Sequence, residues 1–191
     1  SLGNNAQIPK RAKIDSYPTE EKYGLVFCFL GDIPEKERCP IMKVNEYETE
    51  GWRATTQNFQ FNIDYKRSIE NGIDGAHNEF VHPTHGFSGE SDDYKSPPIN
   101  IKETKWGTGF FSQMFAPPLK EKKMRKASGR NENAVVEAGT GHHGISMLWT
   151  QIHPTPNIFI HQYMYETPID EKRTNLFLIN TRNFLTEPEH D

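Results

Sequence analysis

The sixteen residues 70–85 limit what the chain can fold into more than any other stretch, because they crowd carboxylates, amides and three histidines together. Asn71, Asp74 and His77 follow one another at steps of three, which places their side chains in one slanting row if the segment is helical. The sequence predicts such a helix from Ile63 to Val81, although two glycines lower its helix propensity. This helix would carry a polar, histidine-rich site.

His82 lies five positions after His77, about 140° around an ideal helix, so a regular helix would not aim both imidazoles at one atom. Pro83 changes this expectation, because the residue before a proline is pushed out of the α region. The helix should end there and free His82 to turn back toward His77. Two neutral imidazoles beside a carboxylate and an amide are the ingredients of a metal centre.

Two histidines and one carboxylate on one face would leave metal positions open, which is the arrangement of non-haem Fe(II) oxygenases. The order of metal affinities does not by itself favour iron over zinc. A pair of histidines five residues apart is also common in purely structural roles. The residues alone therefore leave three functions open: an iron oxygenase, a zinc-dependent hydrolase and a non-catalytic ligand-binding domain.

Apolar and polar residues alternate in many of the other segments, as is typical of antiparallel strands with one covered face. The predicted strands are residues 25–30, 55–63, 99–115, 135–147, 149–152, 157–165 and 174–182. Residues 117–133 carry five Lys or Arg between positions 120 and 126 and are predicted to be a solvated loop, with a docking patch as the alternative. The fold class is therefore α+β, an antiparallel sheet with one long helix that carries the site.

The composition limits the size of the fold and the kinds of partner that the chain can bind. With 191 residues the chain is long enough for one good-sized domain, or for one domain and a remnant of another. A net charge of −4 argues against general affinity for nucleic acid. The longest apolar run, from Gly24 to Gly31, is far shorter than the roughly 20 residues of a membrane span. The two cysteines form neither a disulfide framework nor a CxxC site, so a reducing cytosol is expected.

The pattern Asn71-x-x-Asp74-x-x-His77-x-x-x-x-His82, followed by Pro83, resembles the mononuclear-iron motif of Rieske non-haem iron oxygenases. It is most similar to terminal oxygenase (alpha) subunits related to vanillate demethylase and pheophorbide a oxygenase. Residues 1–32 resemble the segment that closes a Rieske domain, and residues 181–189 resemble the last strand before a C-terminal helix.

The resemblance implies a division of the chain and a fold. Residues 1–36 would be the C-terminal remnant of a Rieske [2Fe–2S] domain, and residues 37–191 a helix-grip-like catalytic domain. Cys28 and Cys39 lack the Cys-x-His and Cys-x-x-His spacing of the cluster ligands, so these ligands are expected before Ser1. The C-terminal helix is expected beyond the last residue, and the chain alone is expected to be inactive.

The resemblance also implies roles for the site residues. His77 and His82 would ligate Fe(II), and Asn71 would lie near the open iron positions. Asp74 would hydrogen-bond His77 and connect it to a cluster-ligating histidine of a neighbouring subunit in a homotrimer. The third ligand would be an aspartate beyond Asp191, with Asp191 itself as the alternative.

The implied activity is that of an oxygenase. Electrons from NAD(P)H, passed through a reductase or ferredoxin and the Rieske cluster, would activate O₂ to hydroxylate or oxidatively demethylate an aromatic or similarly apolar substrate. The substrate, and the choice between monooxygenation and dioxygenation, stay open. The expected location is the bacterial cytoplasm, with an organelle as the alternative.

The remaining histidines and aromatic residues carry weaker signals. His85 is expected in a surface loop, and His142 and His143 at a glycine-flanked strand start, with pocket lining as the alternative. His161 lies on an alternating strand and fits a core position and a pocket wall equally well. The aromatic residues expected first in the core, and then around an apolar substrate cavity, are Trp106, Phe110, Phe111, Phe115 and Trp149.

Overall fold

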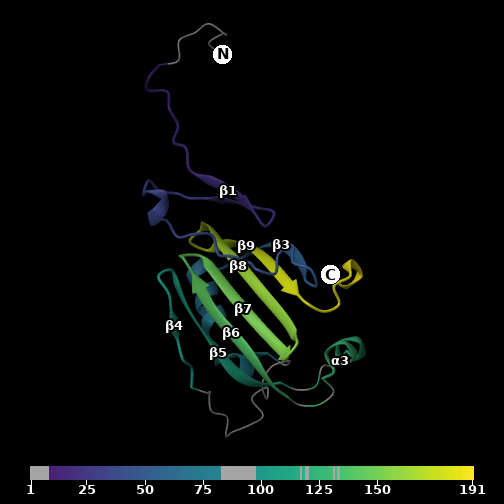
Figure 1. Ribbon diagram of the computed structural model, residues 1–191. Coiled ribbons are helices and arrows are strands. Elements are labelled where there is room, and N and C mark those ends of the chain that lie inside the picture. The colour runs from purple at the N-terminus through teal and green to yellow at the C-terminus, as the bar shows by residue number, and fades with distance from the viewer. Residues whose placement is uncertain (1–8, 83–97, 117, 119–120, 131, 133) are drawn as a thin grey trace. The chain divides into compact units, whose positions relative to one another are not determined.

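Seven strands form one antiparallel sheet in the computed structural model of the chain (Figure 1). The structure describes residues 9–82, 98–116, 118, 121–130, 132 and 134–191. Contacts within the chain divide it into two units, residues 1–41 and 42–191, and the sheet belongs to the second unit. The assignment of residues 1–36 to the end of a Rieske domain stays a prediction.

The first unit contains a β-hairpin, formed by β1 (Thr19–Lys22) and β2 (Leu25–Cys28), and a short 3₁₀ helix, η1 (Glu35–Glu37). Its two turn residues, Tyr23 and Gly24, have φ angles of 56° and 72°. A two-residue turn with both φ angles positive matches the right-handed twist of the flanking strands, so the turn fixes the hairpin register.

The strand order in the second unit is β3-β9-β8-β7-β6-β5-β4. The bounds are β3 (Arg53–Phe61), β4 (Lys102–Glu103), β5 (Gly107–Ala116), β6 (Ala134–His143), β7 (Met147–Thr155), β8 (Ile158–Asp170) and β9 (Arg173–Arg182). Each of the strands predicted by alternation is present. One predicted boundary is wrong, because the turn between β6 and β7 lies at residues 144–146 and begins with Gly144 at a φ of 64°.

The single long helix predicted from Ile63 to Val81 is not formed. The segment folds as α1 (Tyr65–Ile73) and α2 (Asn78–Val81). Asp74 interrupts them, because its backbone is extended and its Oδ1 accepts a hydrogen bond from the Ala76 N–H at 2.9 Å. Such a local side-chain turn competes with the helix, and the neighbouring glycines offer little propensity against it.

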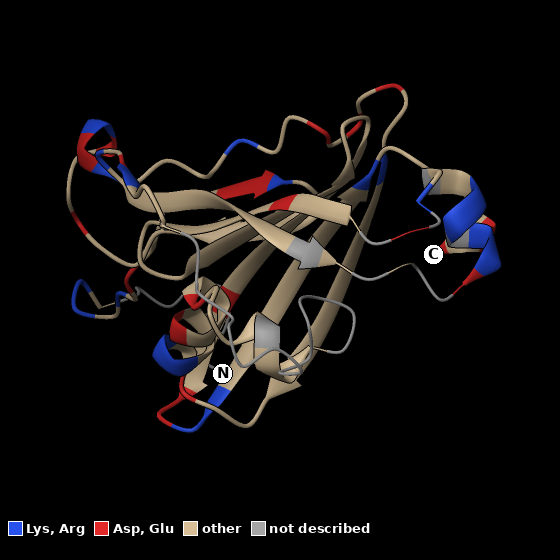
Figure 2. Cartoon of the chain, turned by 90° about the horizontal axis from the view of Figure 1, so that it is seen from below, with Lys and Arg blue, Asp and Glu red and all other residues tan. Residues whose placement is uncertain are grey.

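A third helix, α3 (Lys122–Ser128), occupies part of the segment predicted to be a solvated loop. Figure 2 shows, in blue, the Lys and Arg residues that gather on this short element. Gly129 ends the helix with a φ of 69°, the left-handed conformation that a glycine C-cap supplies. A further 3₁₀ turn, η2 (Pro188–His190), lies near the end of the chain.

α1 packs on one surface of the sheet, over β6, β7 and β8. Asp64 caps its N-terminus by accepting from the Lys66 N–H at 2.9 Å. Ser68 donates to Glu166 at 2.7 Å, and Thr140 donates to the carbonyl of Gly72 at 2.8 Å. We call this surface the helix face; it is defined by Thr140, Leu148 and Glu166.

The opposite surface, which we call the far face, is defined by Trp149, His153, His161 and Tyr163, because successive side chains of a strand point to opposite sides. The segment of residues 42–52 lies against it, and Val44 and Glu46 of that segment are buried. The buried apolar residues of the sheet include Leu148 and Leu176 on the helix face and Tyr163 and Ile179 on the far face. No helix in the described parts of the chain is long and apolar enough to cross a membrane.

Candidate metal centre

His77 and His82 come together at the two ends of α2. His77 is the N-cap of this helix, and its carbonyl accepts from the N–H groups of Phe80 and Val81 at 3.0 and 2.9 Å. His82 follows the helix with an extended backbone, φ −99° and ψ 112°, as expected for the residue before a proline. The chain therefore reverses between them, and the two Nε2 atoms lie 3.2 Å apart.

This separation fits two ligands of one metal ion. Two imidazole nitrogens that each lie about 2.1 Å from a metal and roughly 100° apart are about 3.2 Å from one another. The ring centroids of His77 and His82 are 5.2 Å apart, and the rings are tilted by 55°. The two Nε2 atoms are thus in position to hold a metal ion between them.

Asp74 lies beside the other ring nitrogen of His77. Its Oδ2 is 3.7 Å from His77 Nδ1, which is too long for a hydrogen bond, and its Oδ1 is occupied by the Ala76 N–H. His77 Nδ1 is buried and has no hydrogen-bond partner. A metal-ligating histidine usually donates this N–H to a carboxylate, so Asp74 is close to the group that it is predicted to orient without yet bonding it.

Asn71 is exposed in the last turn of α1. Because Asp74 ends that helix, Asn71, Asp74 and His77 do not form the single helical row that the spacing predicts. His77 instead begins the next helix.

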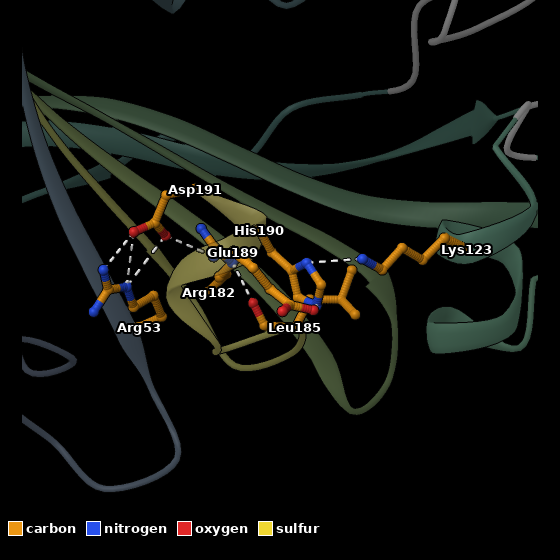
Figure 3. A network of polar contacts seen from close by, with 7 residues as sticks. All are labelled: Arg53, Lys123, Arg182, Leu185, Glu189, His190 and Asp191. Carbon is orange, nitrogen blue, oxygen red and sulfur yellow. Dashed lines mark hydrogen bonds and ion pairs between the residues drawn. The ribbon is translucent and has the colours of Figure 1, made fainter.

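The Asp191 carboxylate forms ion pairs with two arginines. It accepts hydrogen bonds from Arg53 and from Arg182, the latter at 2.8 Å (Figure 3). These bonds from Arg53 and Arg182 lower the pKa of Asp191 to about 2. Among the described residues, no set of three His, Cys, Asp or Glu side chains is placed to hold a metal. The third ligand therefore stays a prediction.

The other predicted residues fall into different surroundings. His85 lies outside the described residues, as does the side chain of Phe115. His142 and His143 line a pocket of about 340 Å³ together with Phe111 and Trp149, in agreement with the pocket-lining alternative. Trp106 and Phe110, like Trp149, are only half-buried.

His161 is buried on the far face, where its Nδ1 lies 2.6 Å from Oε1 of Glu46. The sequence left this histidine undecided between core and pocket wall, and the structure places it in the core. The sequence reasoning did not identify Glu46 or His153, which belong to the same cluster. The partners are distant in the chain, so no local spacing could have shown the cluster.

Similarity to solved structures defines the class of fold. The chain superposes on dicamba monooxygenase bound to 3,6-dichlorosalicylic acid with a TM-score of 0.75 and 18% identity, covering 100% of this chain and 57% of that one. It superposes on Pseudomonas putida CBB5 NdmA with caffeine with a TM-score of 0.69 and 17% identity, covering 97% and 51%. The antiparallel sheet with its few helices is thus the fold of Rieske oxygenase catalytic domains.

The family follows from the sequence match. Residues 61–191 match the model of the vanillate O-demethylase oxygenase C-terminal domain, and the chain belongs to this family. The iron-sulfur subunit TsaM1 of the toluene-4-sulfonate monooxygenase system of Comamonas testosteroni is 31% identical over 78 residues, which are 41% of this chain and 22% of that protein. The chain spans about half the length of the solved structures that it matches.

Proposed function

We propose that the chain is the iron-binding catalytic part of a Rieske-type oxygenase that hydroxylates or oxidatively demethylates an aromatic or similarly apolar substrate. The observation that carries the proposal is the 3.2 Å separation of the Nε2 atoms of His77 and His82 at the two ends of α2. Membership of the vanillate O-demethylase oxygenase family supports iron over the other metals that two imidazoles can hold.

Each side chain of the site has a distinct task. His77 and His82 would hold the ferrous ion through their Nε2 atoms. Fe(II), when bound, supplies the redox chemistry that activates O₂. Asp74 turns toward the buried Nδ1 of His77, which lacks a partner, and fixes the orientation and basicity of that ring. Asn71 would lie near the open iron positions and orient substrate or O₂.

The apolar surroundings suit an apolar substrate. Phe80 and Val81, between the two histidines, are 61% and 64% exposed. Large apolar side chains left exposed beside a metal site are available to contact a substrate and to keep water away from it. The names of the similar proteins, which act on or bind toluene-4-sulfonate, dicamba and caffeine, support a ring-containing substrate.

The remaining parts of the proposal concern the whole protein. A Rieske [2Fe–2S] cluster, held by residues outside this chain, would supply electrons that come from NAD(P)H through a reductase or ferredoxin. Asp74 links His77 to a cluster ligand of the neighbouring subunit in a homotrimer, in the bacterial cytoplasm. Residues 1–36 complete the Rieske domain, and an aspartate beyond Asp191 completes the iron site. The isolated chain is therefore inactive.

The test is the iron content of the full-length protein and of its His77→Ala and His82→Ala variants. A Rieske cluster and one mononuclear site together hold about three iron atoms per subunit, so each variant should keep about two. The visible absorbance of the cluster should be unchanged, and substrate-dependent O₂ uptake should be lost.

His190→Ala is the matched control, because this histidine contacts Lys123 through Nδ1 at 2.8 Å and has no part in the proposed site (Figure 3). It should keep full iron content and O₂ uptake. Full O₂ uptake in His77→Ala would refute the proposal. Zinc in place of mononuclear iron, without O₂ uptake, would identify a hydrolase, and a wild-type protein without metal at these residues would identify a ligand-binding domain.

A further inference from the structure

A continuous chain of polar side chains crosses the far face of the sheet, away from the candidate metal centre. Tyr163 donates to Glu46 Oε2 at 2.9 Å, and Glu46 Oε1 is 2.6 Å from His161 Nδ1. His161 Nε2 is 3.3 Å from His153 Nε2, and His153 Nδ1 is 2.9 Å from Glu137 Oε1. The chain thus runs from a buried carboxylate to an exposed one through two imidazoles.

The middle of this chain is shielded by aromatic rings. Trp52 lies against His161, with ring centroids 5.2 Å apart. Phe159 meets the edge of the His153 ring, and Phe111 lies tilted beside it. Low-dielectric surroundings strengthen a satisfied polar chain and make any unpaired member costly. The protonation of the two imidazoles therefore matters to stability.

The ionisation of the buried end is set by its partners. Burial acts to raise the pKa of the Glu46 carboxyl, but the hydrogen bonds from His161 and Tyr163 outweigh it, so this pKa is lowered. Burial and the charge of Glu46 raise the pKa of Tyr163. Glu46 is therefore a carboxylate, and Tyr163 is a neutral phenol that donates to it.

A count of the protons on His153 and His161 shows that two neutral rings are one proton short of what these contacts require. A carboxylate only accepts, so in this arrangement His161 Nδ1 and His153 Nδ1 each carry the hydrogen that is donated to Glu46 and to Glu137. If both rings were neutral, their Nε2 atoms would be two lone pairs facing each other at 3.3 Å. Only a cation between the two nitrogens makes the contact attractive.

The direction of the rings favours a proton over a metal ion. The ring centroids are 5.5 Å apart and the Nε2 atoms 3.3 Å apart, and the difference is close to the full diameter of an imidazole ring. Both nitrogens therefore lie close to the line between the ring centroids and point roughly at each other. A metal ion would draw the two lone pairs to a common point off this line.

We propose that His153 and His161 share one proton, and that this imidazole–imidazolium pair is a pH-dependent latch that fastens residues 42–52 to the far face of the sheet. The fastening passes through Glu46, the residue of that segment that bonds both His161 and Tyr163. The latch is independent of the proposed iron chemistry.

The sign of the pH dependence follows from proton counting. The folded pair holds one proton, whereas the histidines of the unfolded chain are mostly neutral above about pH 7, so folding takes up a proton there. The stability that the latch provides is present near neutral pH and is lost as the pH rises. A second proton at low pH would set two imidazolium groups against each other and also loosen the latch.

The groups that face the pair are consistent with this sign. They are Glu46 from residues 42–52, Glu137 from β6 and Tyr163 from β8, with Tyr165 next to Tyr163. Two carboxylates flank the imidazoles, one at each end, so the single positive charge of the pair is balanced on both sides.

The direct test is nitrogen-15 NMR of the histidine side chains of the 191-residue chain. Both Nδ1 atoms of His153 and His161 should be protonated, and one strongly deshielded proton should couple to the two Nε2 atoms near pH 7. A neutral pair without a shared proton at that pH would overturn the proposal. A signal that is absent at the start and appears only after EDTA has removed a bound metal would show that a metal is the cation, and would overturn it too.

The second test compares the pH dependence of unfolding in wild type and His153→Gln. One proton taken up on folding changes the unfolding equilibrium constant about tenfold per pH unit. From about pH 7 to 9 this constant should rise more steeply in wild type, by up to that factor, than in His153→Gln. The control His143→Gln should follow wild type, because His143 lies outside the polar chain. Equal slopes in wild type and His153→Gln would refute the latch, and the NMR test decides if this variant does not fold.

Discussion

A methyl group added at Gly72 tests how closely α1 must approach the sheet in order to position the candidate metal centre. A Cβ built at Gly72 would lie 2.1 Å from Cδ2 of Leu148, and also within 3.2 Å of its Cγ. Leu148 is 2% exposed, so its side chain has little free space into which to move. Either Leu148 shifts into its neighbours or α1 lifts from β7.

Two opposing effects set the size of the change. Replacing glycine by alanine inside a helix stabilises it by about 1 kcal/mol. Overpacking a buried contact costs about 1–3 kcal/mol. Because the Cβ would overlap several atoms of one buried side chain, we expect the overpacking cost to win. Gly72→Ala should lower the free energy of unfolding by about 1 kcal/mol.

The sign should reverse when Leu148 is also shortened. Leu148→Ala alone should cost about 2–5 kcal/mol, because it opens a cavity under the helix. In that background the methyl of Gly72→Ala enters free space, and only the helix propensity remains. Gly72→Ala should then stabilise by about 1 kcal/mol, so the two changes should be coupled by about 2 kcal/mol.

Tryptophan fluorescence during urea unfolding measures the stability of wild type, the two single variants and the double variant in the unit that contains α1 and the sheet. The three tryptophans, Trp52, Trp106 and Trp149, all lie in the second unit, which holds the sheet and α1. Gly75→Ala is the control, because a Cβ there would meet Phe110 at an ordinary distance of 3.6 Å. An equal effect of Gly72→Ala with and without Leu148 would refute the close-packing argument.

Two buried or paired carboxyls give opposite pH dependences. Burial raises the pKa of the Glu166 carboxyl from its ordinary 4.5, against the lowering effect of the Ser68 hydrogen bond. The protonated carboxyl therefore stabilises the fold at low pH, and this contribution is lost as the pH rises through the pKa of the folded state. The melting temperature of Glu166→Gln should therefore rise relative to that of wild type as the pH increases from about 4 to 7. A difference between the two melting temperatures that does not change with pH would contradict this. The hydrogen bonds from Arg53 and Arg182 lower the pKa of Asp191 from 3.8 to about 2, so its stabilisation is present above pH 3.8 and lost toward pH 2. Asp191→Asn should melt at a lower temperature than wild type at pH 6, and the two proteins should converge near pH 2; a difference that persists at pH 2 would argue against the ion pairs.

The strands were predictable because alternation is a local signal that follows directly from the period of a strand. The helices were less so. Spacing alone favoured one helix through Asp74, but the hydrogen bond from this side chain to the Ala76 N–H competes with the helix and ends it. The charges of α3 alone predict a solvated loop, although Gly129 soon after the basic residues is a helix stop signal.

The histidine contacts of the structure also differ in how far the local sequence predicts them. The return of His82 toward His77 was predictable, because Pro83 excludes a helical His82 and the two residues are close in the chain. The contact between Glu46 and His161 joins residues that are 115 positions apart, and it depends on how residues 42–52 cross the finished sheet. Nothing in the local sequence of either residue encodes it.

The two histidine pairs of this chain have nearly equal Nε2 separations, 3.2 Å for His77–His82 and 3.3 Å for His153–His161, yet their surroundings suit different cations. The ring centroids are 5.2 Å apart in the first pair and 5.5 Å in the second, so the nitrogens of the first pair point less directly at each other. His82 of the first pair is exposed, whereas His161 of the second pair is buried. Aromatic rings lie against both histidines of the second pair, and each Nδ1 of that pair faces a carboxylate. A metal ion that must bind O₂ and substrate needs bent lone pairs and open positions, and a shared proton needs aligned nitrogens and shielding from water. Direction and access, rather than distance, are therefore what distinguish the proposed metal site from the proposed proton site.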